Sequence, residues 1–120
     1  MKVELIREYR FEAAHYLPRV GPHHKCARLH GHSFRVEVVL RGAVDPESGW
    51  LVDFAVVDEV VEPIIAQIDH RCLNEIEGLD NPTSENLARW LWVAIQPRRP
   101  DLFAIVVWET GDSRCVYRGE

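Results

Sequence analysis

Two N-terminal stretches alternate apolar and polar side chains with the period of two that is typical of a half-buried β-strand. The first runs from Val3 to Leu17 and ends before Pro18, and the second runs from about His32 to Gly42. In both stretches the positions between the apolar residues carry charged residues, as expected for a strand face exposed to water. The pattern predicts two strands joined by a loop over residues 19–25.

The middle of the chain has the spacing of helices. Apolar residues recur in pairs at intervals of four over Val56–Ile68, after Asp53, which is a good N-cap. The β-branched content of this segment would also suit a strand, but the spacing favours a helix with a kink at Pro63. The apolar spacing over residues 83–96 predicts a second amphipathic helix. Thr83 is its N-cap, and Pro97 ends it.

The C-terminal part returns to strands. A nearly continuous apolar run over 102–108 is followed by a polar turn over 109–112 and a short strand over 115–117. A turn cluster over 45–49 leads into a short extended piece at 50–52. The order strand, strand, helix, helix, strand, strand predicts an α+β fold, with an antiparallel four-stranded sheet and both helices on one face. Residues 1–120 are expected to form one domain.

Composition narrows the class of protein. The formal net charge is −5 and the basic residues are scattered, which argues against a nucleic-acid partner. No apolar run has the length of a signal peptide core or a membrane span, so we expect a cytoplasmic protein with no membrane partner. Three cysteines at irregular spacing fit a reducing compartment. A chain of 120 residues is small for an enzyme, which favours a homo-oligomer that completes its pocket between subunits.

Three histidines share the apolar faces of the two predicted strands. His30 and His32 have the same parity with Gly31 between them, and His15 lies on the matching face of the first strand. Pairing of these strands would bring three imidazoles onto one ion, and imidazole is a good zinc ligand. The alternative is a set of hydrogen-bonded structural histidines.

A three-histidine zinc site keeps one coordination position open, which is the catalytic arrangement. An open site polarises a bound oxygen, so a neighbouring carbon is more easily deprotonated if a base is near. Cys26 is the candidate base, because the metal and the basic residues Lys25 and Arg28 would stabilise its thiolate. The alternatives are a fourth zinc ligand that closes a structural site, or an ordinary buried thiol.

Other polar residues are candidates for the same chemistry. His24 lies two residues from Cys26 and is expected to line the site and bind the substrate, whereas His23 is expected to be a solvated loop residue. Asp69 and His70 form a second acid/base candidate, since a carboxylate can fix the tautomer of an imidazole; the alternative is a helix-end pair. Glu109 closes an apolar strand and would suit a ligand with parallel N–H donors, unless it simply reaches water.

Taken together, these residues resemble the 6-pyruvoyl-tetrahydropterin synthase family, and within it the bacterial 6-carboxytetrahydropterin synthases of the queuosine pathway. The resemblance spans essentially the whole chain. It rests on six motifs in order: Phe11-Glu12-Ala13-Ala14-His15, Cys26-x-x-x-His30-Gly31-His32, Gly49-Trp50-Leu51-Val52-Asp53-Phe54, Ile68-Asp69-His70, Asn81-Pro82-Thr83-Ser84-Glu85 and Tyr117-Arg118-Gly119-Glu120.

The resemblance implies the tunnelling fold, in which subunits form trimers, commonly paired into hexamers, with active sites at subunit interfaces. It implies Cys26 as thiol base, Asp69 and His70 as its partner dyad and Glu109 as the carboxylate that anchors the pterin. The zinc ligands it implies are His15, His30 and His32. The three-residue gap before His30 is similar to the queuosine branch, which implies 7,8-dihydroneopterin triphosphate as substrate. Pyruvoyl-forming and aldolase-type pterin enzymes, and a non-enzymatic zinc-stabilised module, are the alternatives.

Overall fold

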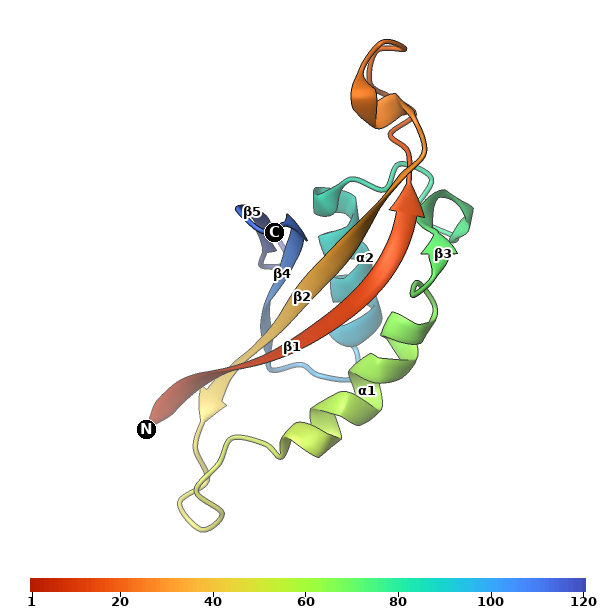
Figure 1. Cartoon of the computed structure of the whole chain (residues 1–120). Coiled ribbons are helices and arrows are strands. Elements are labelled where there is room, and N and C mark those ends of the chain that lie inside the picture. Colours follow the sequence, from red (N-terminus) through yellow and green to blue (C-terminus); the bar gives the residue numbers. More distant parts are fainter.

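Two long antiparallel strands, β1 (Lys2–His15) and β2 (His30–Ala43), pair over their full lengths and form the centre of the sheet. A computed structural model describes all 120 residues of the chain. In it, β2 also pairs with β4 (Leu102–Thr110), and β4 pairs with β5 (Ser113–Tyr117), both antiparallel. The helices α1 (Phe54–Ala66) and α2 (Ser84–Ile95) lie on one face of this sheet (Figure 1). The α+β prediction is therefore confirmed.

The sheet has one strand more than the four predicted. The additional strand, β3 (Arg71–Cys72), lies at the edge and runs parallel to β1, which gives the order β3-β1-β2-β4-β5. Two residues are too few to carry a period of two, so no sequence pattern could reveal this strand. Residues 50–52, predicted as extended, form bends instead.

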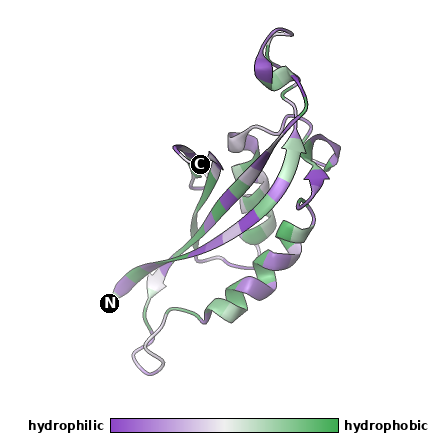
Figure 2. Cartoon of the chain, in the orientation of Figure 1, coloured by the Kyte–Doolittle hydropathy of each residue, from purple (hydrophilic) through white to green (hydrophobic).

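Both helices begin at the residues that the capping pattern predicts. Asp53 accepts a hydrogen bond from the Ala55 amide at 2.9 Å and starts α1 (Phe54–Ala66), which continues through Pro63 without interruption. Thr83 accepts from the Asn86 amide at 3.1 Å and starts α2 (Ser84–Ile95). Each cap satisfies a backbone donor that the helix leaves free. α1 carries alternating hydrophilic and hydrophobic bands because only one of its faces packs on the sheet (Figure 2).

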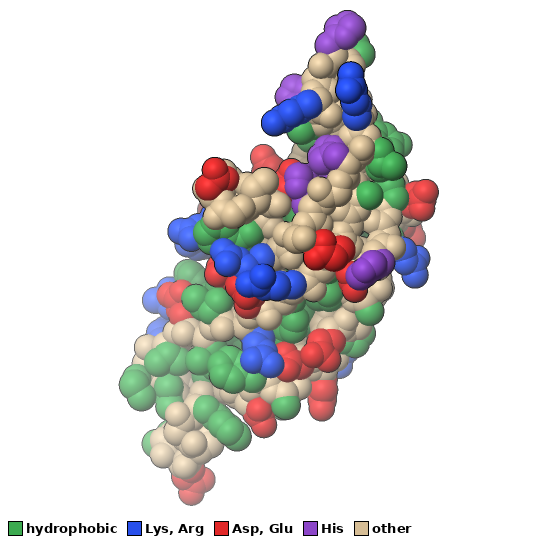
Figure 3. Space-filling model, in the orientation of Figure 1, with side chains coloured by type: hydrophobic (Ala, Val, Ile, Leu, Met, Phe, Trp, Pro, Cys, Tyr) green, Lys and Arg blue, Asp and Glu red, His purple; other side chains and the backbone are tan.

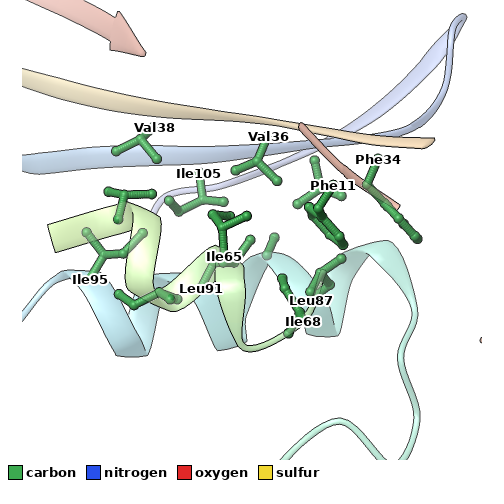
Figure 4. Packing of buried hydrophobic residues seen from close by; sticks show 14 of the residues in the cluster. Phe11, Phe34, Val36, Val38, Ile65, Ile68, Leu87, Leu91, Ile95 and Ile105 are labelled. Atoms are coloured by element: carbon green, nitrogen blue, oxygen red, sulfur yellow. The ribbon is translucent and has the colours of Figure 1, made fainter. Parts of the chain in front are cut away.

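The core fills the space between the sheet and the two helices. Phe11 of β1 stacks on Phe34 of β2 with ring centroids 4.9 Å apart, next to the site described below. Aliphatic side chains from the helices and from β2 and β4 complete the layer (Figure 4). Full burial of each such side chain contributes about 1.5–3 kcal/mol to the stability of the fold. The strand ends that carry the histidines therefore pack on a close-packed layer.

Between β1 and β2 the chain forms a protruding finger, residues 17–29, which extends beyond the end of the sheet (Figure 1). None of its residues is buried, and its only regular element is a short 3₁₀ turn at Lys25–Ala27. Residues 13–36 contain no aspartate or glutamate, although the whole chain is acidic. Histidine and basic side chains gather on the finger (Figure 3), which makes this end of the molecule locally cationic.

None of the helices has the length and apolar character needed to cross a membrane.

Candidate active site

The three predicted metal-binding histidines come together where β1 enters the finger and β2 leaves it. His15 stands opposite His30 in the β1–β2 register, and His32 stands opposite Ala13. The ring centroids are 4.6 Å apart for His15 and His30, 4.9 Å for His30 and His32, and 5.1 Å for His15 and His32. Alternation along two paired strands therefore places three imidazoles around one point.

Two of these rings are oriented by backbone carbonyls. The Nδ1 of His15 lies 2.9 Å from the Pro82 carbonyl oxygen, and the Nδ1 of His30 lies 2.7 Å from that of Arg28. A carbonyl can only accept, so we assign the proton of each ring to Nδ1, which donates. Each Nε2 then keeps a free lone pair. An oriented imidazole of this kind is typical of metal ligands.

The cluster fits a metal ion by its donor atoms and by its protonation. The Nε2 atoms of His15 and His32 are buried and have no hydrogen-bond partner, which is costly unless something binds them. Burial lowers the pKa of both rings, against the opposing effect of the Glu109 carboxylate, so the neutral, ligating form is favoured. With Glu109, the histidines offer four ligand atoms within 4.8 Å of one another. Zinc–nitrogen bonds of about 2 Å are within reach of such a group.

Glu109, near the end of β4, lies between this cluster and the start of α2. One carboxylate oxygen is 3.0 Å from the Nε2 of His32 and 3.8 Å from that of His15, while the other accepts a 2.7 Å hydrogen bond from the Ser84 hydroxyl. The contact between Glu109 and His32 is not a hydrogen bond, because the Nε2 of His32 has no hydrogen-bond partner. Glu109 can therefore face either a metal or a ligand beside it.

Cys26 lies at the histidine cluster. A cavity of about 320 Å³ is lined by Lys25, Cys26, His30, His32, Glu109 and Thr110. The predicted base, a basic side chain, two predicted metal ligands and the predicted anchor thus share one hollow. His24, expected to line the site, is not among these residues; its ring contacts the Cys26 amide instead.

Asp69 and His70 form a hydrogen-bonded dyad at the edge of the sheet. The Nδ1 of His70 lies 2.8 Å from Asp69 Oδ1, so the two adjacent side chains do meet. The backbone of Glu12 in β1 holds both residues: its amide donates to Asp69 Oδ1 at 3.0 Å, and its carbonyl accepts from the His70 amide at 2.6 Å. The Glu12 amide, followed by His70, lowers the pKa of Asp69, which keeps this carboxylate ionised.

The dyad does not share the hollow of Cys26. His70 lines a different cavity of about 550 Å³ together with Glu12, Ser33 and His32, and His32 also lines the cavity of Cys26. The side chain of His70 is 75% exposed. Its φ of +58° is unusual for a residue with a side chain. Within one chain, therefore, Cys26 and the dyad line two different cavities, and His32 borders both.

One acidic residue of this region was not singled out from the sequence. Glu85, in the first turn of α2, lines a cavity of about 420 Å³ with Ser84, Glu109, Arg114 and Cys115. Burial raises the pKa of the Cys115 thiol, and the Glu85 carboxylate raises it further. The signal was present, because Glu85 closes the motif that begins at Asn81, but a first-turn glutamate is also an ordinary helix-start residue.

Comparisons with known proteins agree with this geometry. The model of the family described as 6-pyruvoyl tetrahydropterin synthase matches residues 4–120. A Synechocystis protein named 6-carboxy-5,6,7,8-tetrahydropterin synthase is 38% identical over an alignment of 121 positions, which covers 94% of this chain and 91% of that protein. A Pyrococcus furiosus protein named dihydroneopterin monophosphate aldolase is 36% identical over 112 residues, with 91% of each chain covered.

The fold has a close structural counterpart as well. The structure of Caenorhabditis elegans 6-pyruvoyl tetrahydropterin synthase superposes with a TM-score of 0.92 at 28% identity, covering 100% of this chain and 97% of that one. The match therefore includes the finger and both helices as well as the sheet. With nearly the full length matched in sequence and in structure, the chain belongs to the 6-pyruvoyl tetrahydropterin synthase family of enzymes.

Proposed function

We propose that the protein is a zinc-dependent 6-carboxy-5,6,7,8-tetrahydropterin synthase of queuosine biosynthesis. It would convert 7,8-dihydroneopterin triphosphate and water to 6-carboxytetrahydropterin, acetaldehyde and triphosphate. The observation that carries the proposal is the cavity in which the Cys26 thiol lies beside His30 and His32. The name of the Synechocystis relative and the three-residue gap between Cys26 and His30 support this reaction.

The histidines His15, His30 and His32 would hold the zinc, and two of them, His30 and His32, line the cavity of Cys26. When bound, zinc supplies a Lewis acid that lowers the proton affinity of a coordinated hydroxyl. The carbonyls of Pro82 and Arg28 keep two of the rings in the ligating tautomer. These interactions belong to a single chain, so each subunit would hold its own metal.

Cys26 would remove a proton bound to carbon in the substrate side chain. Lys25 lines the same cavity, so a cationic side chain lies on the same side of the site as the thiol. Basic side chains gather on the finger (Figure 3), and an anionic triphosphate tail would extend toward them. The chain thus places a base and cations on the same side of the metal site.

Glu109 would anchor the pterin by accepting two N–H donors from its aminopyrimidinone edge. Ser84 holds the carboxylate in place at 2.7 Å. Glu85 lines the adjoining cavity and offers a second carboxylate for the same edge. A pterin ring between these groups would place its side chain toward Cys26 and the histidines.

Asp69 and His70 would act on the substrate from a neighbouring subunit, moving protons during tautomerisation and carbon–carbon cleavage. The exposure of the dyad supports this arrangement, as does the finding that His70 and Cys26 line different cavities. So does the shape of the chain, which extends 57 × 24 × 22 Å and has a radius of gyration of 15.5 Å. A compact monomer of this length would have about 13.6 Å. The unpaired edge of β5 and most of that of β1 would be covered in a trimer or hexamer.

A cytoplasmic location remains our prediction. It is supported by Cys26, Cys72 and Cys115, none of which forms a disulfide.

The second candidate is aldol cleavage of a dihydroneopterin, which the name of the Pyrococcus relative favours. It would use the same metal and anchor but leave a hydroxymethyl group on the pterin. A closed, non-enzymatic zinc module would need Cys26 as fourth ligand, and Cys26 is not among the donors that lie within 4.8 Å of one another in the histidine cluster.

Product analysis tests the proposal. The purified protein loaded with zinc is incubated with 7,8-dihydroneopterin triphosphate, and the products are identified by mass. We expect 6-carboxytetrahydropterin and acetaldehyde. A 6-pyruvoyl or 6-hydroxymethyl pterin as the main product would contradict the proposed reaction while keeping the family.

A further inference from the structure

The turn that carries Cys26 is held by hydrogen bonds to both backbone groups of that residue. The Cys26 amide donates to the Nδ1 of His24 at 3.0 Å, and the Cys26 carbonyl accepts from the Leu17 amide at 2.8 Å. Leu17 lies two residues after His15, a predicted zinc ligand. The hydrogen bond from Leu17 thus holds the turn near the predicted metal site. The hydrogen bond to His24 holds the opposite side of the turn.

His24 acts as the N-cap of the 3₁₀ turn Lys25–Ala27. Its backbone is extended, with φ −71° and ψ 136°, and its carbonyl accepts from the Ala27 amide at 3.0 Å. The side chain and the main chain of one residue therefore satisfy two amides of the turn. Asparagine, aspartate, serine and threonine are the usual caps. A histidine can take this role only when Nδ1 is unprotonated and Nε2 carries the proton.

Hydrophobic packing cannot replace these bonds. No residue of the finger is buried, so no apolar core fixes its conformation. Segments with few buried contacts open readily, and their local order depends on individual hydrogen bonds. Loss of the His24 cap would leave Cys26 held on one side only. The thiol would then spend less time aimed at the cavity that it shares with His30 and His32.

We propose that His24 is a positioning residue, which caps the turn and thereby orients the Cys26 thiol. The inference rests on the proposed function, in which Cys26 is the base. It replaces the expectation that His24 binds the substrate directly. The imidazole of His24 accepts a hydrogen bond from the Cys26 amide, and His24 is not among the residues that line the cavity.

The two roles predict different kinetics. If His24 caps the turn, its removal lowers kcat, leaves KM for the substrate almost unchanged, and is rescued by another capping side chain. If His24 binds the triphosphate tail, its removal raises KM, and a neutral asparagine does not restore binding. Variants His24→Ala and His24→Asn separate these cases. His23→Ala is the matched control, because His23 is the exposed neighbour and its side chain forms no hydrogen bond.

The experiment measures kcat, KM, zinc content and the hydrogen-exchange rate of the Cys26 amide in the zinc-loaded enzyme. In His24→Ala we expect kcat to fall and amide exchange to rise by about 3- to 30-fold, the range that corresponds to a lost N-cap, with zinc retained. In His24→Asn we expect both values to return to within about threefold of the parent. His23→Ala should match the parent in all measurements.

Unchanged exchange and kcat in His24→Ala would overturn the proposal, as would an equal rise of KM in both His24 variants at constant kcat. The Cys26→Ala variant separates this failure from that of the proposed function. Normal turnover in Cys26→Ala would refute the thiol base, whereas the amide exchange in His24→Ala reports on the cap without reference to turnover.

Discussion

The two halves of the predicted active site differ in how much of their surroundings one chain supplies. The histidine cluster is enclosed: His15 is fully buried, its ring is oriented by Pro82, and the cavity beside it contains Cys26. The dyad is open, because the side chain of His70 is 75% exposed at the sheet edge. A single subunit thus provides all the donors of the candidate metal site, but leaves the dyad largely exposed.

The dyad is nevertheless well ordered. Two hydrogen bonds to the Glu12 backbone hold it, and His70 adopts a left-handed backbone that costs about 1–3 kcal/mol for a residue with a side chain. Strain of this kind persists when the surrounding structure enforces it, and it clusters at functional sites. The comparison shows that the pair is exposed and yet held in place, as the proposed contact with a partner subunit requires.

The largest effect is expected from removing a ligand in the enclosed half. In His15→Ala the cluster loses its buried central imidazole, so metal binding and turnover should both be abolished. Metal content per chain, measured after dialysis, checks this. His23→Ala, in the exposed finger, serves as the control and should keep its metal. Full zinc occupancy in His15→Ala would show that the cluster is not the metal site.

Next in size is the loss of the base. Cys26→Ala should retain metal and fold while turnover falls by about 100- to 10,000-fold, which is typical of removing a general base. Zinc stoichiometry and exchange of the carbon-bound proton are measured on the same preparation. Loss of zinc in proportion to activity would instead identify Cys26 as a metal ligand.

A smaller effect is expected at the anchor. Glu109→Gln keeps the size of the side chain but replaces an acceptor oxygen by a donor, so pterin binding should weaken by about 1–3 kcal/mol. Titration of a pterin into the metal-loaded protein gives the affinity. Glu85→Gln, measured in parallel, shows which carboxylate contributes more. Unchanged affinity in Glu109→Gln would assign the anchoring to another residue.

The smallest effect concerns pH and the metal-free protein. Burial lowers the pKa of His15 and His32 below the ordinary value of 6.5, so at lower pH the unfolded chain binds more protons than the folded one. The free energy of unfolding should therefore fall as the pH drops below 6.5. Denaturant unfolding at several pH values checks this. His32→Gln should have a shallower pH dependence, and an equally steep one would refute the assignment.

The sequence predicted the enclosed half because its information is local. Alternation places His30 and His32 on one face of a strand, and the same period in β1 brings His15 to them once the two strands pair. Capping residues predicted the starts of both helices for the same reason. Each of these signals lies within a few residues of the feature that it specifies.

The open half depends on geometry that no local pattern encodes. The contact between Asp69 and His70 requires the positive φ of His70 and the hydrogen bonds to Glu12, 57 residues away from Asp69. β3 was missed because a two-residue strand has no period. The cap formed by His24 was missed because histidine is not a usual N-cap.

Mixing two inactive variants tests most directly whether the site is divided between chains. Cys26→Ala and His70→Ala are each purified with zinc, combined in equal amounts, dissociated and reassembled. If Cys26 of one chain works with His70 of the partner subunit, random assembly leaves about a quarter of the sites with both residues intact. We predict that turnover recovers to about that fraction of the parent's. Activity no higher than that of the separate variants would contradict the divided site and place both residues in one chain's own pocket.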